Sequence, residues 1–258
     1  MVGDRRVISP NWYDEADAYD LAFAFATDRE VDMLTHAFAD ADVHPPARLL
    51  EAMIGGARLV PGLADAGFHV FGFDLSSAML GYATRRAPGR VFRADAARFA
   101  AAQAFDGAYC LVDSFRYLLS EADAAACLAS VAAPLSPGAP FILELELSSP
   151  GPPIPDTWTT DRGDERASVC VTNHEDPDGD LQWIDVVVNI TTPNGSHEVR
   201  SSQKQRIWRP DDLASFLTAS PFTLETVWRR TQERGPPLGG LPANGGPVTL
   251  LLRNTSPG

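Results

Sequence analysis

The sequence predicts an α/β fold with a doubly wound, mostly parallel sheet, and two observations support this. Over residues 46–147, short apolar runs of strand type alternate with segments of helical periodicity. From residue 148 the pattern changes to long β-type runs separated by the turn signals DPDGD and TPNGS. The first pattern predicts right-handed βαβ crossovers and helices on both faces of a sheet. The second predicts an antiparallel insertion after the fifth strand.

The expected elements follow in order along the chain. Apolar residues at helical spacing over 16–40 predict helices, with Asp28 as the N-cap of the second, and the prolines after His44 end this run. The alternating segment then predicts strands at 47–53, 69–75, 90–95, 105–113 and 141–147, and helices at 58–66, 76–87, 96–102 and 120–135.

The region after residue 148 predicts a separate unit. The stretch SSPGPPIP at 148–155 is typical of a linker, and three β-type runs at 166–175, 181–192 and 197–208 predict a three-stranded antiparallel sheet. A helix at 210–219 and strands at 222–230 and 248–254 follow. The predicted organisation is therefore an N-terminal helical cap at 1–45, a core at 46–148 and 209–258, and an insertion at 149–208.

Composition excludes several classes of protein. A net charge of −13 argues against a protein that binds nucleic-acid backbones, which needs a basic surface. The chain has no long uninterrupted apolar run and no apolar leader, so we expect neither membrane insertion nor secretion. Its three cysteines are widely spaced and form no Cys/His metal pattern. The expectation is a cytoplasmic globular protein without a bound metal.

Suggestive side chains follow four successive predicted strands. Glu51 leads into Gly55 and Gly56, and Asp74 ends the next strand ahead of serines that suit a helix N-cap. Asp95 ends the third strand, and polar and aromatic residues follow Cys110 after the fourth. In a doubly wound sheet, ligands bind at the carboxyl ends of the strands, and an acidic residue at the second strand end accepts ribose hydroxyls. The pattern predicts a site for a nucleoside cofactor.

The segment from Tyr13 to Leu147 resembles the class I S-adenosylmethionine-dependent methyltransferases. Their acidic-x-Gly-x-Gly-x-Gly pattern appears here as EAMIGGA at 51–57, and Asp74 follows Glu51 by 23 residues. The stretches GFDLSSAMLGYATRRA and LSPGAPFILEL are similar to the family's second strand and the entry to its fifth, and YDEADAYDLAF to the tyrosine-bearing N-terminal helix of its small-molecule enzymes. Two of the three glycines are replaced, by Met53 and Ala57.

The resemblance implies a Rossmann-like seven-stranded sheet with a final antiparallel strand, and an insertion that covers the active site. It also implies methyl transfer from S-adenosylmethionine, with S-adenosylhomocysteine as product, to N or O of a small metabolite. Gly55 would approach the cofactor most closely, Asp74 would bind its ribose, and Asp95 with Ala96 would face the adenine amine. The remaining cofactor contacts implied are Tyr19, Glu51, Leu75, Met79, Cys110 and Leu111.

The acceptor site is expected just after the fourth strand, at residues 113–117. Tyr117 stands where some relatives carry a histidine, so the resemblance makes it a candidate proton acceptor or hydrogen-bonding group; packing of its ring is the alternative. Asp113 either attracts a cationic amine or caps the following helix.

Three functions remain open from the sequence. The first is a methyltransferase with a small-molecule acceptor and no nucleic-acid or membrane partner, as a monomer or a homodimer. The second is a relative that has lost methyl transfer and acts as a cyclase or isomerase, and Met53 motivates it, because its side chain stands where the cofactor's amino-acid end is normally held. The third is a non-catalytic partner subunit. The direction of the Met53 side chain separates the first from the second.

Overall fold

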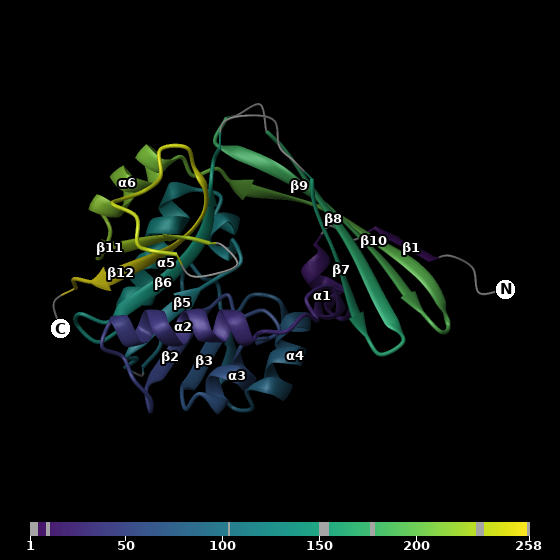
Figure 1. The fold of residues 1–258 in the computed structure, drawn as a ribbon, viewed down its shortest axis with the longest axis horizontal. Helices are drawn as coiled ribbons and strands as arrows, with labels where there is room; N and C mark the ends of the chain where they lie inside the picture. Colours follow the sequence, from purple (N-terminus) through teal and green to yellow (C-terminus); the bar gives the residue numbers. More distant parts are fainter. Residues whose placement is uncertain are drawn as a thin grey trace.

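The computed structural model describes residues 5–8, 11–102, 104–149, 155–175, 179–230 and 235–256. It consists of a seven-stranded sheet covered by helices and a five-stranded sheet that stands beside it, with α1 (Ala16–Ala22) between them (Figure 1). Among these residues, no helix has the length and apolar character needed to cross a membrane. Most of the predicted linker at 148–155 lies outside the described residues.

The seven-stranded sheet confirms the predicted fold class. Its strand order is β11-β12-β6-β5-β2-β3-β4, and β12 alone runs antiparallel to its neighbours. Within this sheet the chain first forms the central β2 and then adds β3 and β4 on one side. It continues with β5 and β6 on the other side of β2, so the strand order reverses between β2 and β5. The strands are β2 (Arg48–Ala52), β3 (His69–Asp74), β4 (Val91–Arg93), β5 (Gly107–Cys110), β6 (Pro140–Leu147), β11 (Phe222–Arg229) and β12 (Gly246–Asn254).

Helices cover both faces of this sheet because successive strand residues point to opposite sides. Leu49 packs into one apolar cluster with the helices α2 (Asp28–Asp40), α3 (Val60–Asp65) and α4 (Ser77–Arg86). Leu50 packs into the other, with α5 (Glu121–Ala132) and α6 (Pro210–Thr218). The strands are therefore buried on both sides, and their carboxyl ends form the edge at which a ligand can enter.

The second sheet has the order β1-β10-β9-β8-β7 and contains more strands than predicted. The three expected runs form β8 (Glu165–Glu175), β9 (Leu181–Thr192) and β10 (Gly195–Arg206). The prediction missed β7 (Asp156–Arg162), whose residues are mostly polar, and β1 (Arg5–Ile8), which pairs parallel to β10 from the other end of the chain. Neither strand shows the apolar alternation that identifies a half-buried strand in a sequence.

Two other local predictions were wrong. The segment 96–102 is a turn and not a helix, because the Asp95 carboxylate accepts a hydrogen bond from the backbone of Ala97 (3.0 Å) and the Phe99 ring packs on Phe73 with 4.1 Å between centroids. The run 16–40 forms two helices, α1 and α2, as predicted, but the N-cap of α2 is Thr27 and not Asp28. A short 3-10 turn, η1 (Trp12–Asp14), leads into α1.

The helix α1 joins the two sheets. Its apolar residues and Trp12 pack on the inner face of the five-stranded sheet. Its buried Asp20 binds Arg86 of α4 (2.7 Å) and Arg162 of β7 (2.8 Å). One carboxylate thus holds an arginine from the core and an arginine from the insertion, and this contact fixes how the two sheets face each other.

We expect the substitution Asp20→Asn to lower the free energy of unfolding by about 1–3 kcal/mol, because two arginines lose a buried partner while both stay partly exposed to water. Urea denaturation followed by tryptophan fluorescence measures this change. The control is Asp161→Asn, which breaks an exposed pair with Arg166 and should leave stability unchanged. Equal stability of the two variants would contradict the linking role of Asp20.

Candidate active site

The loop between β2 and α3 has the backbone of a three-glycine turn. Met53, Gly55 and Ala57 have φ angles of 56°, 54° and 57°, so all three positions of the glycine pattern are left-handed. This conformation costs a residue other than glycine about 1–2 kcal/mol. The loop lies directly on β3, because a Cβ on Gly72 would come within 2.9 Å of the Cβ of Ile54. The conformation of the pattern is therefore present although two of its glycines are not.

Asp74, at the end of β3, is tied to this loop. Its Oδ2 accepts from the backbone N–H of Gly55 and its Oδ1 from that of Ser76, both at 2.8 Å. Ser76 caps α4 as expected, since its hydroxyl accepts from the N–H of Met79 (3.2 Å). Burial raises the pKa of Asp74, and the backbone donors counteract this rise. The carboxylate thus stays beside Gly55 at the carboxyl edge of the sheet.

The apolar residues expected beside a base differ in exposure. Leu75 is 60% exposed, which makes it one of the few large apolar side chains open to solvent in the described chain, and it directly follows Asp74. Met79 is fully buried, and its Cε lies 3.4 Å from the position of a Cβ on Gly55. Leu75 therefore offers an open apolar surface at this site, whereas Met79 supports the loop from below.

The third and fourth strand ends lie at the same edge. Asp95 is exposed and closes the turn after β4, with the buried Ala96 next to it. Cys110 ends β5 and Leu111 follows it, and both are buried; burial raises the pKa of the Cys110 thiol well above its ordinary value. The thiol packs in the same apolar cluster as Phe115 and does not line the cavity described below.

Glu51 is a buried carboxyl group on β2. The hydroxyl of Tyr109 donates to its Oε2 at 2.9 Å, and burial raises the pKa of Glu51 to about 8 despite this bond. The positive charge of Arg58 also acts on Glu51 and lowers its pKa in part. At neutral pH the Glu51 carboxyl group is therefore mainly protonated. An additional positive charge beside it would favour its ionised form.

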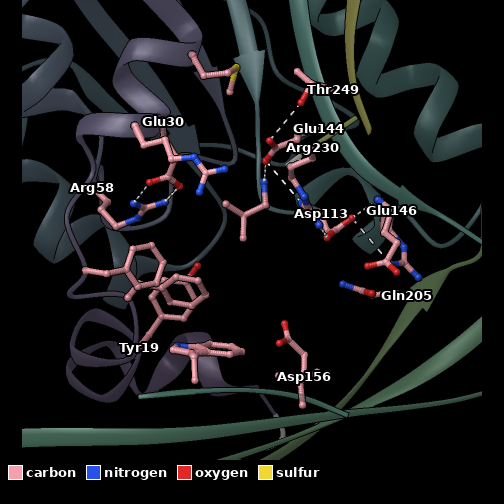
Figure 2. Close-up of a pocket in the computed structure, with 18 of the residues that line it drawn as sticks. Tyr19, Glu30, Arg58, Asp113, Glu144, Glu146, Asp156, Gln205, Arg230 and Thr249 are labelled. Atoms are coloured by element: carbon pink, nitrogen blue, oxygen red, sulfur yellow. Dashed lines mark hydrogen bonds and ion pairs between the residues drawn. The ribbon is translucent and has the colours of Figure 1, made fainter. Parts of the chain in front are cut away.

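A cavity of about 950 Å³ is lined by residues of both sheets and by Arg58, which directly follows the loop (Figure 2). Tyr19 and Arg58 lie on one side of it, and Asp113, Glu144, Glu146 and Arg230 lie on the other. Asp156 of β7 reaches it from the five-stranded sheet. The cavity is thus enclosed by the core, by the N-terminal segment and by the insertion.

One wall of the cavity is aromatic. Tyr19 stacks on Phe23 with ring centroids 4.6 Å apart and meets Trp12 edge-on at 4.8 Å. Tyr117, in the 3-10 turn η2 (Ser114–Tyr117), meets Tyr13 at 5.6 Å and shares hydrogen bonds with the side chains of Tyr13 and Gln205. Burial raises the pKa of Tyr19 and of Tyr117. Both phenols therefore stay protonated and act as hydrogen-bonding groups.

The opposite wall is built from charges that bind one another. The left-handed Asp113 accepts from the backbone N–H of Glu146 and from both terminal nitrogens of Arg230, at 3.3 Å. It stands at the N-cap of η2 but forms no capping bond. Glu144 accepts from Thr249 (3.3 Å) and from the N–H of Val112 (3.2 Å). Asp113 therefore ties this wall together and has little capacity left for an acceptor.

Three charged residues of this wall, Glu144, Glu146 and Arg230, were not predicted from the sequence. A signal for the two glutamates was present in the strand FILELEL, because residues two apart on a strand lie on the same face. Arg230 had no such signal, since it follows β11 and meets Asp113 across 117 residues of chain. No group of three or more His, Cys, Asp and Glu side chains suited to a metal ion is found within the described ranges.

The Met53 side chain does not line the cavity. It packs, partly buried, against the apolar cluster that contains Leu50 and Ala52 of β2. The cavity wall next to the loop is formed instead by Arg58, which directly follows Ala57.

Comparison with known proteins agrees with this geometry. Residues 49–138 match the methyltransferase domain family. No curated protein matches the chain. A structure of an S-adenosylmethionine-dependent methyltransferase from Clostridium acetobutylicum superposes with a TM-score of 0.72 and 16% identity, over 95% of this chain and 100% of that one.

Two further structures are similar. An amino pentose methyltransferase from Micromonospora echinaspora, solved with S-adenosylmethionine bound, has a TM-score of 0.63 and 21% identity, over 93% of this chain and 91% of that one. A sugar N-methyltransferase from a Streptoalloteichus species has a TM-score of 0.70 and 19% identity, over 91% of each chain. At such identities the likeness shows the fold. The chain therefore has the fold of the class I S-adenosylmethionine-dependent methyltransferases, and its residues 49–138 match the methyltransferase domain family.

Proposed function

We propose that the protein transfers a methyl group from S-adenosylmethionine to N or O of a small metabolite in the cytoplasm. The observation that carries this proposal is the left-handed backbone at residues 53, 55 and 57 beside Asp74, followed by Arg58 in the wall of a cavity of about 950 Å³. A cavity of this size is typical of small-molecule sites. The net charge of −13 supports a small-molecule acceptor over a nucleic acid.

The residues present fit the cofactor. A carboxylate offers about four lone-pair sites, and the backbone of Gly55 and Ser76 uses two of those of Asp74, so ribose hydroxyls have sites left to bind. The exposed Leu75 would contact the adenine. Glu51 would face the ammonium group of the amino-acid end. When bound, the cofactor supplies an electrophilic methyl group on a sulfonium.

The protein's part in the reaction is to hold and orient the acceptor. Methyl transfer requires the nucleophile to be aligned with the methyl and sulfur atoms, which depends on positioning more than on covalent help. The aromatic wall around Tyr19 would keep water from the reacting atoms, and Tyr117 would orient the acceptor through its hydroxyl. Since its pKa is raised, Tyr117 serves as a donor and not as a general base.

Two carboxylates of the cavity are free to meet the acceptor. In the part of the chain that the structure describes, neither the Glu146 nor the Asp156 side chain forms a hydrogen bond or an ion pair. The two lie on different sheets, and the charge of Asp156 helps to raise the pKa of Glu146. We therefore assign Glu146 and Asp156, and not Asp113, to the binding of the acceptor's amine or hydroxyl group.

We expect S-adenosylhomocysteine to bind the protein and to raise its melting temperature. At a ligand concentration of 100 times Kd, binding raises the free energy of unfolding by about 2.7 kcal/mol. The substitution Asp74→Asn removes the charge that accepts from the ribose and should weaken binding at least about tenfold. Isothermal titration calorimetry measures both. The control is Asp65→Asn at the exposed end of α3. No heat of binding and no thermal shift at millimolar ligand would contradict the proposed function.

The affinity for S-adenosylhomocysteine should rise with pH. Below pH 8 Glu51 is mainly protonated and must lose a proton before it pairs with the ligand's ammonium group, so the cost of binding falls as pH rises through this range. Between pH 6 and pH 8 we expect the affinity to increase by up to about fiftyfold, because the ionised fraction of Glu51 rises from about 1% to about 50%. The variant Glu51→Gln should show a flatter calorimetric profile. Equal pH slopes in the two proteins would exclude Glu51 as the titrating partner.

A further inference from the structure

The inner face of the five-stranded sheet closes one side of the cavity. Three apolar side chains line the cavity there, Val171 of β8 and Ile184 and Val186 of β9. In the antiparallel register Val171 stands opposite Val186, and Asn173 stands opposite Ile184. Side chains two apart on a strand lie on the same face. Asn173 therefore lies beside this apolar patch, and it also lines the cavity.

The amide group of Asn173 lacks a hydrogen-bond partner. Its Oδ1 is enclosed, and no donor among the described residues bonds it. A buried polar atom in this state costs free energy that the fold does not recover from its own contacts. The terminal torsion of an asparagine side chain is soft, so the amide can turn this oxygen toward an occupant of the cavity. The group therefore suits a ligand that brings a hydrogen-bond donor.

Most other polar side chains that this sheet presents to the cavity are already bonded. Trp158 donates to a backbone carbonyl oxygen of α1 at 2.7 Å, and Gln205 bonds a phenol of the aromatic wall. Asp156 is the exception, as described above. It stands opposite Val171, so it is the diagonal neighbour of Asn173, at about 7–8 Å. Two hydrogen-bond acceptors thus lie side by side on one face of the sheet.

This side of the cavity carries negative charge. Within the described ranges, every arginine that lines the cavity comes from α2 or from the core, and the five-stranded sheet contributes neither an arginine nor a lysine. The charge of Asp156 also acts on Glu146 at the end of β6 and helps to raise its pKa. A cation between these carboxylates would relieve their repulsion, so the cavity favours a positively charged occupant.

We propose that Asn173 is a specificity-determining residue that binds a hydroxyl group of the acceptor, an inference that rests on the proposed function. The class of acceptor that fits this face is an amino alcohol. Its ammonium group meets Asp156, its hydroxyl group meets the amide of Asn173, and the apolar frame between them lies on Val171 and Ile184. A hydroxyl group both donates and accepts, so it satisfies either end of the amide.

Calorimetry with three ligands of one frame tests the proposal, with S-adenosylhomocysteine present at saturation. The ligand trans-4-aminocyclohexanol carries an ammonium and a hydroxyl group at opposite ends of an apolar ring. Cyclohexylamine lacks the hydroxyl group, and cyclohexanol lacks the ammonium group. Wild type should bind the amino alcohol about tenfold more tightly than cyclohexylamine, as expected for one hydrogen bond to an unpaired partner. Cyclohexanol should bind at least about tenfold more weakly than the amino alcohol.

The variants assign each contact to one residue. Asn173→Val should bind the amino alcohol and cyclohexylamine equally within about twofold, and it should keep the wild-type affinity for cyclohexylamine. Its melting temperature should equal or exceed that of wild type, because the unpaired amide is gone and valine suits a strand. Asp156→Asn should weaken both amines at least about tenfold and leave cyclohexanol unchanged. The matched control Asn189→Val, at an exposed position of β9, should change no affinity.

The outcomes separate this inference from the proposed function. Wild type that binds S-adenosylhomocysteine but does not prefer the amino alcohol to cyclohexylamine would overturn the inference alone. Equal losses of both amines in Asn173→Val would also overturn it, because the substitution would then act on the cavity wall and not on the hydroxyl group. A melting temperature of Asn173→Val below that of wild type would show that the amide is paired within the fold, with the same consequence. Wild type that does not bind S-adenosylhomocysteine would overturn the proposed function itself.

Discussion

The left-handed backbone of residues 53, 55 and 57 is the constraint on which the candidate site depends. It turns the chain sharply enough that Gly55 reaches Asp74 and Ile54 donates to the carbonyl oxygen of Phe73 at 2.9 Å. The strain at Met53 and Ala57, about 1–2 kcal/mol each, is offset by these bonds and by the burial of Ala57 and Ile54. A sequence without two of three glycines thus keeps the turn, because its surroundings determine the backbone more strongly than local preference does.

The second sheet makes this edge into an enclosed site. The core alone would leave the carboxyl ends of its strands open to water. The helix α1 packs on the five-stranded sheet and binds the core through Asp20, so its Tyr19 lies in the cavity wall on the same side as Arg58. Reactants at a methyl-transfer site need alignment and exclusion of water, and both depend here on contacts between residues far apart in the sequence.

The sequence predicted what local pattern determines. Buried strands, the serine cap on α4, and acidic residues at strand ends follow from periodicity and turn chemistry, and the structure has Glu51, Gly55, Asp74 and Asp95 along one edge. The wall of the acceptor cavity was not predictable in this way. The pairing of Asp113 with Arg230 depends on the order and register of β6, β12 and β11. The direction of Met53 depends on its φ angle, which a methionine does not signal.

The central claim is that the loop binds the cofactor with its methionine in place. The most direct measurement is the affinity of wild type and of the Met53→Gly variant for S-adenosylhomocysteine by calorimetry. Because the Met53 side chain packs against the core and away from the cavity, the account predicts that wild type binds and that the two dissociation constants agree within about threefold. A wild type that does not bind, beside a glycine variant that does, would contradict it.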